Sequence, residues 1–190
     1  MPTPARTSVE NLIETARQIL EAEGLEGLTM QRVAAEVGVR APSLYKHVRN
    51  RADLIRLVTE DVARQLTKLV ERAASTGDPA TDLRSIARGF RSFAHTNPGA
   101  YGLIFGPLAD EWRTAPETLA TGTEALIRST SALAGPDHAL EAARTVVAWA
   151  HGFVSMELAG AFRMGGDVDD AFEFGLERII DALSAGERRT

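Results

Sequence analysis

Apolar residues recur at intervals of three and four along almost the whole chain, and no segment of four or more residues alternates as a strand does. The first helical stripe ends at Gly24 and contains Leu12, Ile13, Ala16, Ile19 and Leu20. Thr7 and Glu10 stand in front of it with the spacing of a capping box. A second, short helix follows Thr29 as N-cap and ends at Gly38, with an inward face of Val33, Ala34 and Val37. The pattern predicts an all-α protein.

Proline, glycine and asparagine delimit the remaining helices. A third short helix carries Pro42 in its first turn, and a fourth begins after Asn50 and reaches about Ser75. Asp53 is placed to reach back and complete the cap of that fourth helix. Later breakers delimit helices near 79–95, 99–105, 116–134, 137–163 and 168–184. We expect about nine helices in two domains, which are a three-helix head over residues 1–53 and a helical body over residues 54–190.

The composition restricts the class of protein. With 44% hydrophobic residues the chain can bury a proper core, and without cysteine it cannot use disulfides, thiolate zinc sites or cysteine nucleophiles. The N-terminal segment lacks the apolar run of a signal peptide. The most apolar stretch, 145–162, is nearly long enough to cross a bilayer, but Glu157 within it is costly there, so a buried helix is expected. A cytoplasmic protein without a membrane partner is expected.

The net charge of −5 argues against a nucleic-acid partner until its distribution is considered. Residues 1–53 contain seven basic and seven acidic side chains, so the whole negative excess lies in residues 54–190. Within 37–52 no residue is acidic and four are basic, namely Arg40, Lys46, Arg49 and Arg51. A local cationic patch on an acidic protein attracts DNA to one face and repels it from the rest.

The stretch from Gly27 to Leu54 has the layout of a helix-turn-helix. The turn at Gly38-Val39 is tight, and Val39 and Leu44 are placed to pin the third helix onto the second. The third helix would then expose Arg40, Ala41, Ser43, Tyr45, Lys46 and His47. Periodicity alone leaves an alternative open, which is a plain helical hairpin whose polar face is merely solvated.

Specific residues carry the argument further. The stretch contains Gly27-Leu28-Thr29, then Ala34 to Val39 as Ala-X-X-X-Gly-Val, then Leu44-Tyr45-Lys46-His47-Val48, and finally Asn50-Arg51. These motifs, in this order and at these spacings over residues 10–55, resemble the DNA-binding head of the tetracycline-repressor (TetR) family. The resemblance implies a sequence-specific DNA-binding transcriptional regulator, with repression as the usual outcome.

The resemblance also implies roles for individual residues. Base edges would be faced by Gln31, Ala41, Pro42 and Lys46. Phosphates would be held by Thr29, Ser43, Tyr45, His47 and Arg51. Arg40 departs from the small hydroxyl residue that often caps the recognition helix, and a phosphate or base contact could take the place of that cap. Tyr45 could instead pack against the first helix, and His47 could instead make a structural hydrogen bond.

The last two predicted helices, 137–163 and 168–184, are candidates for pairing. The final one repeats apolar residues on one face, namely Phe172, Leu176, Ile179, Ile180 and Leu183. The preceding one is apolar on most of its circumference and therefore needs cover on several sides. The resembled family dimerises through a four-helix bundle of these helices, which implies a homodimer on a palindromic operator. The alternative is an ordinary monomer core.

The body also resembles a branch of the family with a Trp-X-His-Gly signature, here Trp149-Ala150-His151-Gly152 followed by Glu157-Leu158-Ala159-Gly160. The expected partner is a small, apolar or aromatic effector that changes the setting of the fourth helix. Candidate pocket residues are Phe90, Phe93, Tyr101, Phe105, Trp112, Trp149, His151 and Met156. Most residues of such a set belong to the core in helical proteins, and His151 could be a hydrogen-bonded core histidine.

Other classes of protein find less support. An enzyme is not expected, because HExxH, P-loop, GxGxxG and GxSxG patterns are missing. Asp167, Asp169 and Asp170 look like a metal cluster, but their spacing suits a cap for the last helix, so neither a metal nor a cofactor is expected. A ligand-binding helical protein without DNA-binding activity is the main alternative. An architectural DNA binder without sequence choice would need a more lysine-rich third helix.

Overall fold

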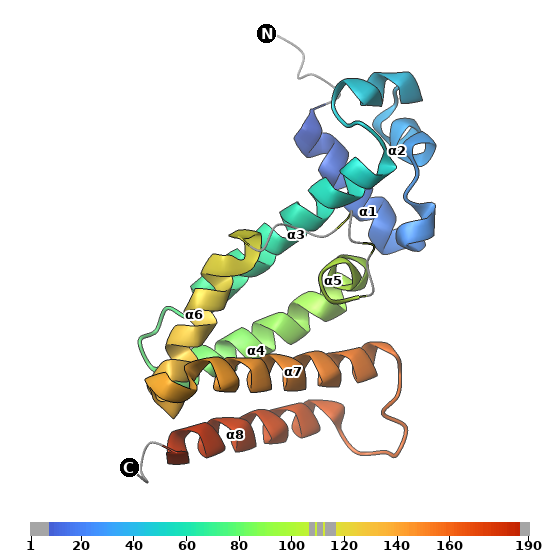
Figure 1. Cartoon of the computed structure of the whole chain (residues 1–190). Coiled ribbons are helices and arrows are strands. Elements are labelled where there is room, and N and C mark those ends of the chain that lie inside the picture. The colour runs from blue at the N-terminus through green and yellow to red at the C-terminus, as the bar shows by residue number, and fades with distance from the viewer. Residues whose placement is uncertain (1–7, 107–108, 110–111, 113–116, 187–190) are drawn as a thin grey trace. The chain divides into compact units, whose positions relative to one another are not determined.

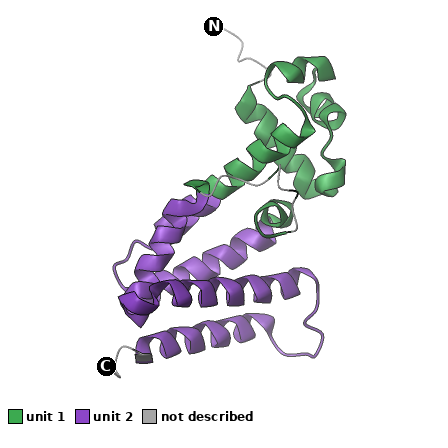
Figure 2. Cartoon of the chain, in the orientation of Figure 1, with its two compact units in different colours: residues 1–64, 97–118 green, residues 65–96, 119–190 purple. Residues whose placement is uncertain are grey.

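The computed structural model describes residues 8–106, 109, 112 and 117–186, and every regular element among them is helical (Figure 1). The all-α prediction is therefore confirmed. The chain divides into two compact units (Figure 2). Unit 1 comprises residues 1–64 and 97–118, and unit 2 comprises residues 65–96 and 119–190. The predicted functional division at residue 53 does not coincide with these units and stays a prediction.

Unit 1 begins with α1 (Val9–Gly27), which buries the apolar stripe that the sequence predicted. Ser8 caps this helix, since its hydroxyl accepts the N–H of Asn11 at 3.2 Å, and the predicted cap Thr7 lies outside the described residues. The helical path breaks at Gly24 (φ 71°, ψ −177°), as predicted, because only glycine takes this conformation without strain. One further helical turn follows the break.

The helix-turn-helix consists of α2 (Met30–Val37) and the 3₁₀ helix η1 (Ala41–Lys46). Thr29 caps α2 by accepting the N–H of Arg32 at 3.1 Å. Gly38 ends α2 in the left-handed conformation (φ 76°, ψ 34°), and the N–H of Val39 bonds to the carbonyl of Ala34 at 2.9 Å. The predicted cap and turn are both confirmed.

The long helix α3 (Arg51–Ala73) runs from unit 1 into unit 2. Asn50 and Asp53 cap its N-terminus through two hydrogen bonds, as the sequence predicted. Asn50 accepts the N–H of Asp53 at 2.9 Å, and the Asp53 carboxylate accepts the N–H of Arg49 at 2.9 Å. The core of unit 1 is formed by fully or almost fully buried residues of its helices, including Leu12, Leu28, Val33, Leu44, Leu54, Ile55 and Val58.

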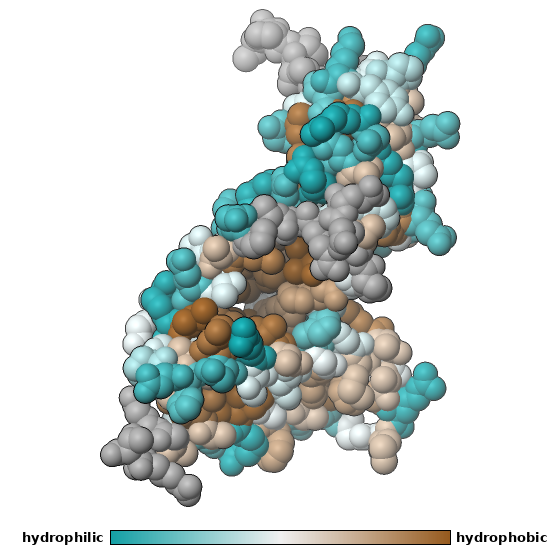
Figure 3. All heavy atoms as spheres, viewed as in Figure 1, coloured by the Kyte–Doolittle hydropathy of each residue, from teal (hydrophilic) through white to brown (hydrophobic). Residues whose placement is uncertain are grey.

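Unit 1 also contains α5 (Pro98–Phe105), which contacts α1. Unit 2 contains α4 (Pro79–Thr96), α6 (Glu117–Ala134), the 3₁₀ helix η3 (Pro136–His138), α7 (Ala139–Leu158) and α8 (Val168–Gly186). Its core joins α4, α6, α7 and α8 through residues such as Leu83, Leu126, Val146, Phe172 and Leu176. In Figure 3 hydrophilic side chains dominate the visible face of the head, whereas apolar side chains gather over unit 2.

The helix predicted over 137–163 is shorter than expected. It ends at Leu158 because Gly160 adopts a left-handed conformation (φ 60°). The N–H of Gly160 then bonds to the carbonyl of Glu157, and the N–H of Ala161 bonds to that of Met156, which closes the helix end. No helix in the described part of the chain is both long enough and apolar enough to span a membrane.

Candidate nucleic-acid interface

The segment η1 is anchored on one side and open on the other. Leu44 is fully buried and Val48 is 2% exposed, so these two residues fix the segment in the core of unit 1. The 3₁₀ geometry follows from a six-residue length with Pro42 in the first turn, which is too short for a regular α-helix with several closed turns. Arg40 occupies the N-cap position without a side-chain cap bond, as the departure from a hydroxyl residue predicted.

Most of the predicted DNA-contacting side chains lie on the open side. Tyr45 is 56% exposed, and its position is therefore outside the core of the head. The other exposed members are Thr29, Gln31, Arg40, Pro42, Lys46 and His47, while Ala41 and Ser43 are half-buried. These exposed residues of α2, η1 and their flanking positions are accessible to a partner, and their contact with DNA stays a prediction.

The basic residues of the head fall into two groups. Three are already engaged, since Arg17 pairs with Glu14, Arg32 pairs with Glu23 and Glu36, and Arg51 bonds to backbone carbonyls. Within the described residues, the side chains of Arg40 and Lys46 make neither an ion pair nor a hydrogen bond. The side chain of Arg49 is 86% exposed, with its Nε 3.8 Å from Asp53. These three cations remain available to an external anion.

Arg51 differs from the other predicted contact residues. Its Nε donates to the carbonyl of Leu28 and its Nη2 donates to the carbonyl of Leu25, both at 2.6 Å. Its guanidinium also lies 5.7 Å from the ring centroid of Trp112. Nothing local in the sequence signals these contacts, because the two carbonyls are 23 and 26 residues away from Arg51.

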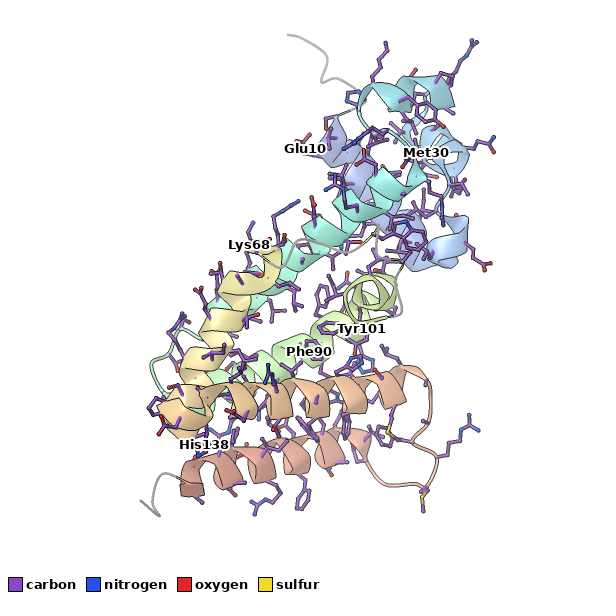
Figure 4. All side chains as sticks on the ribbon, viewed as in Figure 1. Glu10, Met30, Lys68, Phe90, Tyr101 and His138 are labelled. Atoms are coloured by element: carbon purple, nitrogen blue, oxygen red, sulfur yellow. The ribbon has the colours of Figure 1, made fainter. Side chains whose placement is uncertain are left out.

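The eight predicted effector residues are distributed over both units. Figure 4 shows Phe90 on α4 and Tyr101 on α5, which belong to different units. Tyr101 is 5% exposed and its ring lies 5.1 Å from that of Phe105 in a tilted arrangement, whereas Met156 is 46% exposed. Trp149 belongs to the core of unit 2 and stacks on Phe172 at 5.1 Å. Phe90, Phe93, Trp112 and His151 are half-buried. As a pocket, this set stays a prediction.

Sequence reasoning missed a series of ion pairs in unit 2. Arg84 pairs with Glu177 and Arg88 with Glu173, each through two hydrogen bonds of 2.7 and 2.8 Å. Arg91 contacts both Glu157 and Asp169 at 2.5 Å. Only the spacing of arginines along α4 could have hinted at this series, because the partner carboxylates lie 66 to 93 residues away.

Glu157 is the most buried carboxylate of this series, with a side chain 6% exposed. Burial acts to raise its pKa, but hydrogen bonds from Arg91 and His95 prevail and hold the pKa below the ordinary value. A cavity of about 270 Å³ beside it is lined by Arg88, Arg91, Ser92, His95, Asp169 and Phe172. A smaller one of about 180 Å³ lies between α4 and α6. Neither is lined by any of the eight predicted effector residues.

Comparison with known protein families matches both parts of the chain. The family described as bacterial regulatory proteins of the tetR family matches residues 12–58. The family described as the tetracyclin repressor-like C-terminal domain matches residues 83–179. A helix-turn-helix-type transcriptional regulator of Mycobacterium tuberculosis, Rv0681, is 30% identical over 190 residues, which cover 98% of this chain and 85% of the relative.

Solved structures show the same fold. A protein of unknown function from Rhodococcus sp. RHA1 has a TM-score of 0.79 at 23% identity, over 96% of this chain and 100% of that chain. ActR of Streptomyces coelicolor, solved in complex with (S)-DNPA, has a TM-score of 0.70 at 24% identity, over 96% of this chain and 99% of that chain. At these identities the likeness concerns the fold alone.

Proposed function

The chain belongs to the TetR family of helix-turn-helix transcriptional regulators, and we propose that it represses transcription as a homodimer on a two-fold symmetric operator, which a small molecule releases. The observation that carries the proposal is the open side of η1, where Arg40 and Lys46 are exposed beside the buried anchor Leu44. Cations without a partner inside the described protein are suited to phosphates and to base edges.

Each residue of the predicted contact set then has a role. Gln31, Ala41, Pro42 and Lys46 face base edges in the major groove, with Lys46 donating to guanine O6 or N7. Phosphates are held by Thr29, Ser43, Tyr45 and His47, which set the register without reading the sequence. Arg40 contacts a phosphate or a base, which suits an exposed residue without a cap bond.

The homodimer forms through α7 and α8. Large apolar side chains are exposed on α7 at Leu140 (44%), Val147 (41%) and Met156 (46%), and on α8 at Phe174 (68%). Leu140 and Val147 are seven residues apart and therefore lie on the same face of α7, and exposed apolar side chains arranged in this way are typical of a surface that another molecule covers. A second copy of the same two helices covers it as a four-helix bundle, and the two heads then reach successive major grooves about 34–36 Å apart.

A small apolar or aromatic effector binds the body and favours one of two settings of α3. It acts only through unequal affinity for the two settings, because a ligand that binds both equally shifts nothing. The fold neighbour ActR was solved in complex with (S)-DNPA, so this architecture is known with a bound ligand. The proposed lining within unit 2 is Phe90, Phe93, Trp149, His151 and Met156.

Selection of bound sequences from random duplex DNA tests the proposal. We expect enrichment of a palindrome whose half-sites are centred about one or two helical turns apart. Failure to enrich any sequence would contradict the operator, and a single unsymmetric half-site would contradict the dimer. A panel of chemically diverse compounds titrated into the complex with the enriched duplex then tests release.

A further inference from the structure

Arg51 is bonded to the corner between α1 and α2, which is the stretch from Leu25 to Leu28. Its two carbonyl partners, Leu25 and Leu28, both belong to the turn that follows the break at Gly24. Bonds of 2.6 Å from a guanidinium to carbonyl oxygens are short and charge-assisted, and such bonds are about twice as strong as neutral ones. The last turn of α1 contains no basic residue of its own, so Arg51 supplies the positive charge that the carbonyl end of a helix favours.

The corner that Arg51 holds leads directly into the DNA-facing surface. Leu28 is fully buried, and the next residue is Thr29, the N-cap of α2. Gln31 follows in the first turn of the same helix. A displacement of the Leu28 carbonyl would therefore displace the cap of α2 and both of these side chains together.

Trp112 completes the arrangement from the segment that follows α5. Its ring lies over the guanidinium of Arg51 at 5.7 Å, a distance typical of a cation–π contact. The guanidinium therefore contacts the indole ring while two of its nitrogen atoms donate to the carbonyls. Arg51, Trp112 and the corner all belong to unit 1.

We propose that Arg51 is a positioning residue for operator binding, which clamps the carbonyls of Leu25 and Leu28 beneath the ring of Trp112 and so places Thr29 and Gln31 on the DNA. This role replaces the phosphate contact that the family resemblance implies for Arg51. It rests on the proposed operator binding, but the clamp itself is a property of the free protein.

The salt dependence of operator affinity separates the two roles. A phosphate contact releases counterions, so its loss from both protomers would make the slope of log K against log salt shallower by about 1.8. Loss of a clamp lowers the affinity and leaves the slope unchanged. The probe is the duplex that the wild-type protein enriches from the random pool, and the variants are Arg51→Ala, Arg51→Lys and, as control, Arg64→Ala, which removes a positive charge farther along α3.

We expect Arg51→Ala and Arg51→Lys each to weaken binding about ten-fold at an unchanged slope, because an ammonium group cannot reproduce the planar fork. Arg64→Ala is expected to match the wild type. The proposal is overturned if Arg51→Lys binds like the wild type while Arg51→Ala shows the shallower slope. It is equally overturned if both variants keep wild-type affinity.

Amide exchange on the free protein tests the clamp without DNA. The N–H groups of Leu28 and Thr29 bond to the carbonyls of Leu25 and Gly27, so they report on the corner directly. They are expected to exchange faster in Arg51→Lys, and also in Trp112→Leu, which keeps the arginine and serves if Arg51→Ala does not fold. Wild-type exchange rates in both variants would refute the clamp. Should the wild type enrich no duplex, the proposed function fails and this measurement still decides on Arg51.

Discussion

The carboxylate of Glu21 on α1 accepts the backbone N–H of Gly99 in the first turn of α5 at 2.8 Å. Its other oxygen accepts the N–H of Ala100, also at 2.8 Å. Asn97, at the N-cap position of α5, provides no side-chain cap bond, so Glu21 does from a distant helix what a local cap does elsewhere. This contact fixes α5 to α1 within unit 1.

Replacing Glu21 with alanine is expected to lower the free energy of unfolding by about 1–2 kcal/mol, because two donors at the positive end of a helix lose their acceptor. Denaturant unfolding followed by circular dichroism measures the change. Glu26→Ala removes the same charge at an exposed position of the same helical run and is the control. Equal stability of the two variants would show that the cap on α5 contributes nothing.

The free energy of unfolding should depend on pH through the ionisation of the buried carboxylate of Glu157. Because Arg91 and His95 hold its pKa below 4.5 in the folded state despite burial, the ionised form favours folding. This contribution is complete above about pH 5 and disappears as the pH falls through 4.5 toward the folded-state pKa. We expect Glu157→Gln to cost about 1–3 kcal/mol at neutral pH and progressively less as the pH falls below 4.5.

Chemical unfolding at a series of pH values measures this convergence. The matched control is Glu173→Gln, because Glu173 also pairs with an arginine, Arg88, but both side chains are more exposed, at 40% and 53%. Its cost should stay below about 1 kcal/mol. A difference between wild type and Glu157→Gln that is constant with pH would contradict the assigned ionisation.

Local signals made most of the fold predictable. Gly24, Gly38 and Asn50 ended or began helices where the sequence indicated, because each acts through its own backbone or its nearest neighbours. The end of α7 was wrong by five residues, since Gly160 stands among small residues that continue a helical pattern. At the candidate interface, the exposed set on η1 followed from the buried anchor Leu44.

Contacts between distant segments could not be predicted. In the sequence nothing distinguishes Arg51 from the other members of the cationic patch, whereas in the fold it bonds to the carbonyls of Leu25 and Leu28. The same is true of the bond between Glu21 and the first turn of α5, and of the arginines on α4. A charged side chain has no preferred sequence separation for such partners, so a single sequence contains no periodicity that reveals them.

Lys46→Ala should weaken binding to the enriched duplex by about 1–3 kcal/mol and relax the preference at one position of each half-site, because a donor to a base edge is lost. Fluorescence anisotropy against a panel of single-base variants measures both effects. Lys68→Ala, which removes an exposed lysine from the unit 2 part of α3, is the control. If Lys46→Ala combined with Tyr45→Ala leaves affinity unchanged, η1 is not the DNA-contacting segment.

Val147→Glu tests the proposed pairing surface at the middle of α7. Val147 is 41% exposed in the single chain, so a glutamate there costs a monomer little. In a four-helix bundle of two copies, however, the carboxylate would be buried without a partner, which is strongly unfavourable. Sedimentation velocity should therefore show a dimer for the wild type and a monomer for the variant at micromolar concentration, with unchanged helicity.

The control for this variant is Met164→Glu, which adds the same charge in the loop between α7 and α8, where the methionine is fully exposed. It should remain dimeric, because that position lies outside both helices. The monomeric variant should also lose most of its affinity for a palindromic duplex, since a single head reads only one half-site. A Val147→Glu protein that stays dimeric would place the interface elsewhere on unit 2 and remove the geometric basis for the half-site spacing.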